Sequence, residues 1–282
     1  MPQPEFRPPA VGLLLASLPE PQPWRSPGIP PGTPPRLPGR HLRPLVGRPA
    51  LSHLVERLQM ARTVRQVVVT LSVAPEDDAL AHTARHAGAL VYRGSLHDIT
   101  GRLCGCADWL RLPDEAPLVR VGADSLLIDP RYLDAGVQAL LDTGAGVFEF
   151  LEDQSEELCP GLGAGFFRAG LLRHVDRRGQ RPEHRGDPLA YAYEFPAEVG
   201  LVRRPLPDSL SYLRGRHRLL LQTAEDLAML EVLYLRLHQC APVDTAAAVR
   251  VLDNDPVLAS LNQGVLRRSG TLPLPQLGWR VR

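Results

Sequence analysis

The hydrophobic positions of the chain form short apolar runs separated by stretches with helical periodicity. Between the runs, apolar residues recur three and four positions apart, as in amphipathic helices. Strands that alternate with helices usually form right-handed βαβ units, so the pattern predicts an α/β fold with a mostly parallel sheet. The strands are expected at residues 11–16, 67–71, 89–92, 118–121 and 147–150, and the helices at residues 51–58, 75–87, 102–110 and 130–141.

The pattern weakens after residue 150. Thr223-Ala-Glu-Asp226 has the form of a capping box, and it opens a strongly apolar helix that is predicted to end near Leu237. We find no linker that divides the chain, so residues 1–282 are predicted to form a single domain with a loop-rich second half. Further short strands are expected at residues 166–167, 201–202 and 219–221.

Proline and glycine are dense between residues 18 and 44. Because proline lacks a backbone N–H and fixes φ, this segment is predicted to be neither a helix nor a central strand. We expect residues 18–35 to form an extended, proline-rich insertion loop at the surface. The end of the segment, Arg36-Leu-Pro-Gly-Arg40, is instead a candidate for function.

Composition favours a globular protein that needs no disulfide or metal for its stability. The chain has 282 residues, 44% of them hydrophobic, which is enough to bury a large core. Cys104 and Cys106 are two positions apart, Cys159 and Cys240 stand alone, and no Cys-x-x-Cys pair occurs. Structural zinc sites use paired ligands at closer, repeated spacing, so free buried thiols are expected here.

Hydropathy and charge argue against two kinds of partner. No apolar run approaches the roughly 18 residues of a transmembrane helix, and the run Val11–Ala16 is too short for the core of a signal peptide. We therefore predict a cytoplasmic protein that does not bind membranes. The formal net charge of +1 gives no indication of nucleic-acid binding, and none is predicted.

The chain contains no lysine. A lysine Schiff base, a lysine general base and a phosphate-binding lysine are therefore excluded. Any cationic role falls to arginine, which stays protonated and can bind a phosphate group through two hydrogen bonds at once.

Candidate ligand-binding positions follow from the predicted sheet. In sheets of this type, ligands bind beyond the carboxyl ends of the strands. Here those ends are Ala16-Ser17, Thr70–Ser72 and Gly122–Asp124. Ser72 and Asp124 are thus expected at the binding edge.

Seven segments occur in an order and spacing that hold from about residue 36 to the C-terminus. They are Arg36–Leu45, Pro75–Asp78, Tyr92–Ser95 with Asp98 and Arg102, Asp124–Pro130, Glu183-His184, Arg218–Asp226 and Leu252–Leu258. In these segments the chain resembles the spore-coat-polysaccharide type of cytidylyltransferase, a relative of the enzymes that make CMP-activated acidic sugars.

The resemblance implies a three-layer α/β/α Rossmann-like nucleotidyltransferase fold. It also implies transfer of CMP from CTP to a sugar for surface polysaccharide, and it allows a homodimer. Such a step needs cations on the triphosphate and a Mg²⁺ held by carboxylates, because charge moves onto the leaving pyrophosphate. Together with the strand-end position Ser72, the resemblance makes Ala16, Gly39, Asp98 and Arg102 the residues expected to bind the nucleotide, Arg36, Arg40 and Asp124 those expected to act in catalysis, and Asp124 the expected metal ligand.

Several of these residues have a purely structural interpretation as well. In this interpretation the Arg36–Arg40 segment is a solvated basic turn, and Asp124 is a turn residue whose side chain bonds its own backbone. Asp98 and Arg102, one helical turn apart, either pair on a helix face or contact substrate. Asp129, which is followed by a proline, is predicted to be a helix N-cap rather than a ligand.

The chain departs from the family pattern at positions that carry charge. Ser17 follows Ala16 where the family has an arginine, and Arg40 stands where it has a lysine. Gln222 replaces the second metal aspartate. Two further carboxylates are missing from Gly161–Gly165, whose glycines do not lie between a strand and a helix and so predict no dinucleotide site.

These departures leave two functions open: a cytidylyltransferase-like enzyme, and a non-catalytic member of the same fold that binds a nucleotide or a protein partner. A neutral amide cannot replace the charge of a carboxylate on Mg²⁺. The departures therefore argue against a magnesium cofactor, whereas the resemblance argues for one. If Gln222 faces Asp124, Gln222→Asp is expected to strengthen Mg²⁺-dependent CTP binding by about tenfold.

Overall fold

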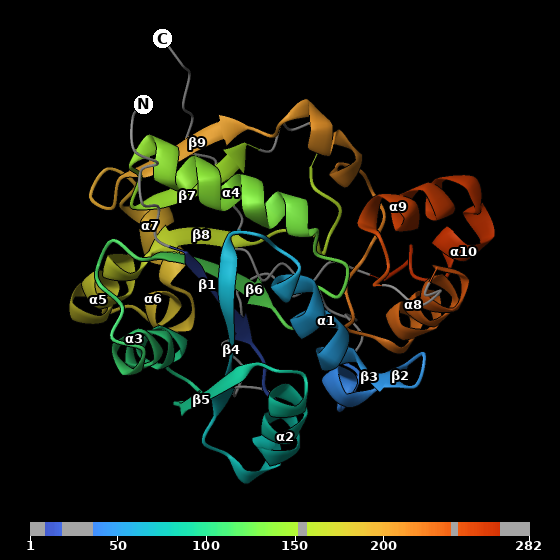
Figure 1. Ribbon diagram of the computed structural model, residues 1–282, viewed down its shortest axis with the longest axis horizontal. Helices are drawn as coiled ribbons and strands as arrows, with labels where there is room; N and C mark the ends of the chain where they lie inside the picture. The colour runs from blue at the N-terminus through green and yellow to red at the C-terminus, as the bar shows by residue number, and fades with distance from the viewer. Residues whose placement is uncertain (1–8, 19–35, 152–156, 238–241, 266–282) are drawn as a thin grey trace, which may run out of the picture.

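The computed structural model describes residues 9–18, 36–151, 157–237 and 242–265. Within these residues the chain forms a mostly parallel sheet with helices packed on both faces (Figure 1). Of the predicted insertion loop at residues 18–35, residues 19–35 lie outside the described residues.

The main sheet of the described residues has seven strands. They are β1 (Ala10–Leu15), β4 (Val64–Ser72), β5 (Leu90–Gly94), β6 (Pro117–Gly122), β7 (Val147–Leu151), β8 (Gly165–Arg168) and β9 (Leu201–Pro205). Their order across the sheet is β5-β4-β1-β6-β8-β7-β9. β1 lies parallel to both β4 and β6, whereas β8 runs antiparallel to β6 and β7. The predicted α/β class and mostly parallel sheet are confirmed.

Helices complete a three-layer arrangement. They are α1 (Ala50–Gln59), α2 (Asp78–His86), α3 (Ile99–Trp109), α4 (Pro130–Thr143), α5 (Ala169–Arg178), α6 (Pro182–Gly186), α7 (Pro188–Glu194), α8 (Ala224–Leu237), α9 (Thr245–Asn254) and α10 (Pro256–Ser260). One hydrophobic cluster joins the sheet to α1, α2 and α4, and a second joins it to α3, α5 and α7. Neighbouring residues of β1 divide between the two, with Leu14 in the first and Leu13 in the second, because successive strand side chains point to opposite faces.

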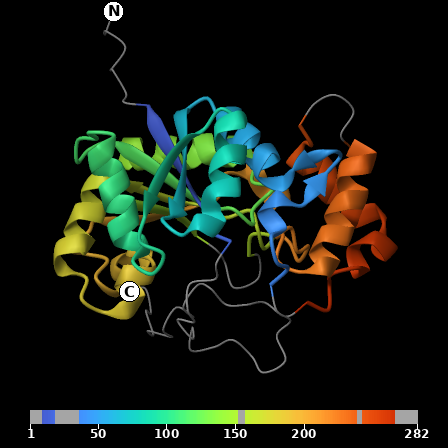
Figure 2. The same ribbon diagram turned by 90° about the horizontal axis from the view of Figure 1, so that it is seen from below.

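The remaining elements are short. They are the hairpin strands β2 (Pro44–Leu45) and β3 (Arg48–Pro49) and the 3-10 helices η1 (Arg40–Leu42), η2 (Pro75–Asp77) and η3 (Asp208–Leu213). Figure 2 shows α8, α9 and α10 grouped at one end of the molecule, next to the β2–β3 hairpin.

Local sequence signals explain the ends of α4. The Asp129 side chain accepts a hydrogen bond of 2.8 Å from the backbone N–H of Arg131, and Pro130 occupies the first helical position. Gly144 ends the helix with φ 67°, in the left-handed region that glycine adopts without strain. The prediction that Asp129 is an N-cap is confirmed.

The strand predicted at residues 219–221 is wrong. Leu219 and Leu221 are fully buried, but their backbone amides bond to loops: Leu219 N–H donates to the Pro160 carbonyl at 2.7 Å, and Leu221 N–H to the Asp124 carbonyl at 2.9 Å. An apolar run indicates burial, and it does not specify whether the backbone partner is a strand or a loop. The helix predicted at residues 102–110 begins earlier, at Ile99, because Asp98 caps it.

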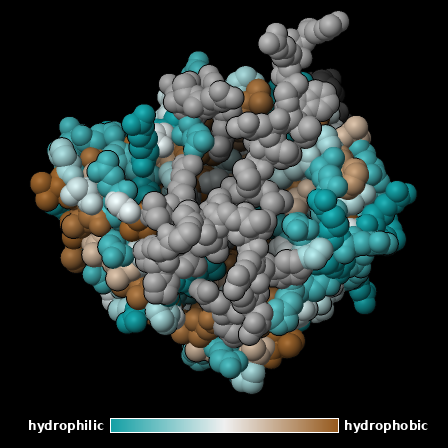
Figure 3. Space-filling view, turned by 180° about the vertical axis from the view of Figure 1, so that it is seen from behind, coloured by the Kyte–Doolittle hydropathy of each residue, from teal (hydrophilic) through white to brown (hydrophobic). Residues whose placement is uncertain are grey.

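In the described part of the chain, Cys104 and Cys106 are free and buried, as predicted, and Cys159 is buried as well. Burial raises the pKa of the Cys106 thiol to about 12, which keeps it protonated and unreactive near neutral pH. No helix among the described residues is long and apolar enough to cross a membrane. The described surface in Figure 3 is largely hydrophilic with scattered hydrophobic patches, as is ordinary for a protein exterior.

Candidate active site

The carboxyl ends of β1 and β6 form the centre of the candidate site. From β1 the chain moves to β4 and β5 on one side of the sheet, while β6 lies on the other side, so the strand order reverses between β1 and β6. Ligands in open α/β sheets bind at such switch points. The two strand ends are tied together by the Ala123 N–H, which donates to the Leu15 carbonyl at 3.0 Å. Ala16 and Asp124 therefore lie at adjacent strand ends.

The basic turn at residues 36–40 is fastened over this edge. Gly39 has φ 65°, a conformation that favours glycine, and it turns the chain into η1. The Leu37 N–H donates to the Gln222 carbonyl at 2.6 Å. Arg40, only 7% exposed, donates from Nε to Asp124 Oδ1 at 2.6 Å. The structure thus brings together Gly39, Arg40 and Asp124, three of the predicted site residues.

Both carboxylate oxygens of Asp124 accept hydrogen bonds from protein side chains. Oδ1 takes the Arg40 contact, and His41 Nε2 lies 3.7 Å from the same atom. Oδ2 accepts from Gln222 Nε2 at 3.0 Å. Burial by itself would raise the pKa of Asp124, but Arg40, His41 and Arg36 together hold it below its usual value. Asp124 is therefore an anion that is neutralised by this chain's own cations.

Gln222 is held in place by a buried ion pair. Arg218 Nη2 donates to Gln222 Oε1 at 3.1 Å, and Arg218 also pairs with Asp226 through two bonds of 2.7 and 3.0 Å. Asp226 accepts from the Thr223 N–H at 3.0 Å, and Thr223 Oγ1 accepts from the Asp226 N–H at 3.3 Å. This reciprocal pair confirms the predicted capping box. It also means that the Asp226 carboxylate is turned toward Arg218, Thr223 and Asn262.

Asp77 organises the neighbouring strand ends. It is fully buried and accepts from Ser17 Oγ at 3.1 Å, from Leu18 N–H at 2.6 Å, and from both the N–H and the hydroxyl of Ser72. Sequence reasoning assigned Asp77 no role, although it lies in a segment that carried the resemblance. The Ser72 hydroxyl donates to Asp77, so a nucleotide contact by Ser72 stays a prediction.

Arg102 and Asp98 have different surroundings although they are one helical turn apart. Asp98 Oδ1 accepts from the Gly101 N–H at 2.8 Å, and its other oxygen pairs with Arg185. Arg102 is 4% exposed, and its Nε and Nη1 have no hydrogen-bond partner among the described residues. Burial lowers the pKa of Arg102, and the attraction of Asp77 partly opposes this. Asp98 thus caps α3 and pairs with Arg185 rather than with Arg102, and a contact of either residue with substrate stays a prediction.

The residues of the site, as they are arranged here, do not fit a magnesium ion. The part of the chain that the structure describes contains no cluster of three or more His, Cys, Asp or Glu residues that could hold a metal. Both oxygens of Asp124 already accept from N–H donors, and a nitrogen donor of Gln222 points at the carboxylate where a second acid would stand. Magnesium prefers oxygen ligands.

His41 is buried beside this cluster and is neutral. Burial, together with the nearby positive charge of Arg40, lowers its pKa to about 4, although the attraction of Asp124 opposes the shift. An unfolded chain would take up a proton at this histidine near its ordinary value of 6.5. Between pH 6.5 and about pH 4, the unfolded state therefore binds more protons than the folded state.

We therefore expect stability to fall as the pH is lowered from about 6.5 to about 4, by on the order of 3 kcal/mol from His41 alone. His41→Gln should remove this part of the pH dependence, whereas His82→Gln, at an exposed position of α2, should keep it. Urea unfolding across this range measures the slope for each protein. Equal slopes in wild type and His41→Gln would contradict the assignment.

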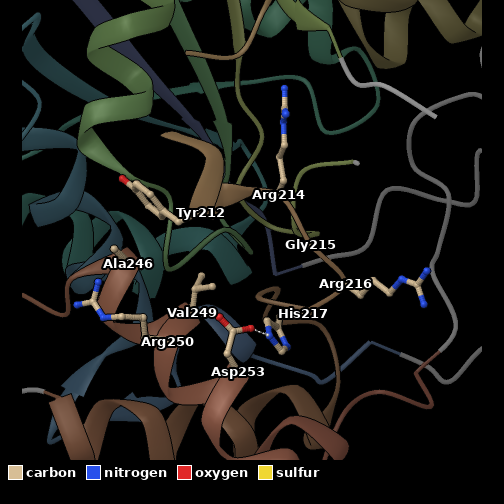
Figure 4. Close-up of a pocket in the computed structure, with 9 residues that line it drawn as sticks. All are labelled: Tyr212, Arg214, Gly215, Arg216, His217, Ala246, Val249, Arg250 and Asp253. Atoms are coloured by element: carbon tan, nitrogen blue, oxygen red, sulfur yellow. Dashed lines mark hydrogen bonds and ion pairs between the residues drawn. The ribbon is translucent and has the colours of Figure 1, made fainter. Parts of the chain in front are cut away.

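A separate cavity of about 360 Å³ lies between η3 and α9, lined by Tyr212, Arg214, Gly215, Arg216, His217, Ala246, Val249, Arg250 and Asp253. His217 Nε2 and Asp253 Oδ1 pair across it at 2.8 Å. In Figure 4 the side chains of Arg214, Arg216 and Arg250 point in different directions rather than toward one point. The cavity is therefore distinct from the cluster around Asp124, and its arginines do not form a common anion site.

Comparison with known proteins identifies the family of the chain. A sequence model of the cytidylyltransferase family matches residues 35–208. The spore coat polysaccharide biosynthesis protein SpsF of Bacillus subtilis is 25% identical over 238 residues, covering 80% of this chain and 92% of that protein. A 3-deoxy-manno-octulosonate cytidylyltransferase of Marinobacter nauticus is 28% identical over 185 residues, covering 64% of this chain and 66% of that enzyme.

Solved structures show the same fold. A cytidylyltransferase from Leptospira borgpetersenii has a TM-score of 0.73 at 21% identity, over 93% of this chain and 99% of that chain. CMP:2-keto-3-deoxy-manno-octonic acid synthetase complexed with CTP has a TM-score of 0.58 at 16% identity, over 81% and 99% of the two chains. The predicted three-layer, Rossmann-like nucleotidyltransferase fold is confirmed. Since the family match spans more than half of its length, this chain belongs to the cytidylyltransferase family.

Proposed function

We propose that this protein binds CTP over the carboxyl ends of β1 and β6 and transfers CMP to a sugar used in surface polysaccharide. The supporting observation is that the basic turn closes over the strand-order reversal, with Arg40 held against Asp124. A relative that covers most of both chains is a spore coat polysaccharide biosynthesis protein. A cytoplasmic location belongs to this proposal, and the homodimer that the resemblance allows stays a prediction.

In the proposed reaction a sugar oxygen attacks the α-phosphorus of CTP, and the bond to the departing pyrophosphate breaks. Negative charge grows on the leaving group, so fixed cations lower the barrier most when they face it. Arg36 and Arg40 would supply that charge, and Gly39 would let the backbone approach the phosphates. Arg102, buried and with two N–H groups lacking partners among the described residues, would contact the nucleotide together with Ala16, Ser72 and Asp98.

Arg40→Ala is expected to weaken CTP binding by tenfold or more, because it removes a charged contact to phosphate worth about 1.4 kcal/mol or more. Arg48→Ala is a matched control, since Arg48 also pairs with a carboxylate, that of Glu56, but lies exposed on the β2–β3 hairpin. Isothermal titration calorimetry measures both. Unchanged CTP affinity in Arg40→Ala would remove Arg40 from the binding site.

A non-catalytic, nucleotide-binding role is the second candidate. It is favoured by the saturated Asp124 carboxylate, which accepts from Arg40 and Gln222. Pyrophosphate release from CTP in the presence of a panel of sugars and sugar acids separates the two functions, with ATP, GTP and UTP as controls. CTP binding with release of pyrophosphate supports the transferase, and CTP binding without release for any acceptor supports the second role.

A further inference from the structure

The carboxylates of the cluster around Asp124 are paired with arginines. Arg36 and Arg40 are the cations that act on Asp124, and His41 is neutral near physiological pH because of its lowered pKa. Arg218 and Asp226 offset each other through their two hydrogen bonds. The Arg40 guanidinium therefore offsets the Asp124 carboxylate, which leaves no unpaired negative charge there to attract a divalent cation.

Arg40 bonds to Asp124 through only one of its three guanidinium nitrogens. Nε is used by Asp124, and the two terminal amino groups of Arg40 have no acceptor among the described residues. A guanidinium held through Nε keeps its terminal N–H groups in a plane that matches two oxygens of one phosphate. The Asp124 carboxylate is itself held on its other oxygen by Gln222, which Arg218 orients in turn. Asp124 is thus a positioning residue for Arg40.

We propose that the Arg40 guanidinium takes the place of a divalent metal in this site, so that the chain binds the phosphates of a metal-free cytidine nucleotide directly. The inference rests on the proposed CTP site and goes beyond it in naming the ionic form of the ligand. Two departures from the family pattern, Arg40 and Gln222, then act together: one supplies the cation, and the other fixes the carboxylate that aims it.

Calorimetric titration of the full chain with CTP, once in EDTA and once in excess MgCl₂, tests the proposal. We expect CTP to bind in EDTA with an affinity equal to or higher than that in Mg²⁺, because Mg²⁺ neutralises the phosphates that Arg40 recognises. Affinity that is tenfold or more higher in Mg²⁺ would overturn this inference and leave the proposed CTP site intact. Binding in neither condition would overturn both.

Arg40→Lys tests the geometry of the fork while it keeps the charge. We expect CTP affinity in EDTA to fall by tenfold or more, since an ammonium group can neither hold Asp124 through Nε nor form the paired contact. Arg48→Lys, on the exposed hairpin, should leave the affinity unchanged. An Arg40→Lys protein that binds metal-free CTP as tightly as the wild type would contradict the role of the guanidinium.

Binding of Mn²⁺, followed by its electron paramagnetic resonance signal without any nucleotide, gives a second readout. The double variant Arg40→Ala/Gln222→Asp removes the cation and adds a carboxylate opposite Asp124. It should bind Mn²⁺ at least tenfold more tightly than the wild type. Gln66→Asp, at an exposed position in the first half of β4, adds the same charge away from the site and should not. Wild-type affinity for Mn²⁺ equal to that of the double variant would overturn the proposal, and circular dichroism verifies that each variant folds.

Discussion

Asp77→Ala is expected to lower the free energy of unfolding by about 4 kcal/mol, the largest effect of any single change considered for this protein. Asp77 is fully buried, and its carboxylate accepts from Ser17, Leu18 and Ser72. Alanine would remove the acceptor of the buried Ser72 N–H and O–H groups, and a buried donor that loses its acceptor keeps the full cost of desolvation. The ends of β1 and β4 would also lose the group that joins them.

The neighbouring Asp78 offers a matched control. Its side chain is 69% exposed and pairs with Arg93 at the surface, so Asp78→Ala should cost no more than about 1 kcal/mol. Urea unfolding gives both values. Hydrogen exchange should show faster opening at Ser17, Leu18 and Ser72 in Asp77→Ala only. A loss below about 1 kcal/mol in Asp77→Ala would mean that these donors find other partners.

We expect Arg57→Met to lower the free energy of unfolding by about 3 kcal/mol. Arg57 lies on α1, is 2% exposed, and donates from Nε to the Ile128 carbonyl at 2.8 Å. Its terminal amino groups bond to the Val243 carbonyl and the Thr245 hydroxyl. One side chain therefore joins α1 to the loop before α4 and to the start of α9.

Methionine preserves most of the volume of Arg57, so the expected loss reports the orphaned acceptors rather than a cavity. Burial of the charged guanidinium, which lowers the pKa of Arg57, already reduces the stability of the wild type. Methionine removes that cost, so the net loss of stability is smaller than the lost hydrogen bonds alone would give. Arg62→Met is the control, since the Arg62 side chain is 90% exposed and its contact with Asp134 is 3.4 Å long. The midpoints of thermal and urea unfolding should fall for Arg57→Met and stay unchanged for Arg62→Met. Equal midpoints for the two variants would refute the role of Arg57 in joining α1 to the loop before α4 and to α9.

The sequence by itself determined the alternation of strands and helices, the class of the fold and several helix ends. These features depend on residues within about four positions of one another. Asp129 and Pro130 begin α4, and Thr223 and Asp226 begin α8, whatever the rest of the chain does. The resemblance carried by short segments also assigned Arg40 and Asp124 to a single site before any geometry was known.

Only the tertiary structure decided what the polar side chains bind. Arg40 is 84 residues from Asp124, and Gln222 is 98 residues from it, yet the three form one hydrogen-bonded group. The apolar run at residues 219–221 reported burial, but a loop rather than a strand became its backbone partner. Arg57 lay unnoticed beside the apolar positions of a predicted helix. Two polar groups form a hydrogen bond when the fold brings them within about 3 Å of each other. When they are far apart in the sequence, the local pattern around each group does not specify the other.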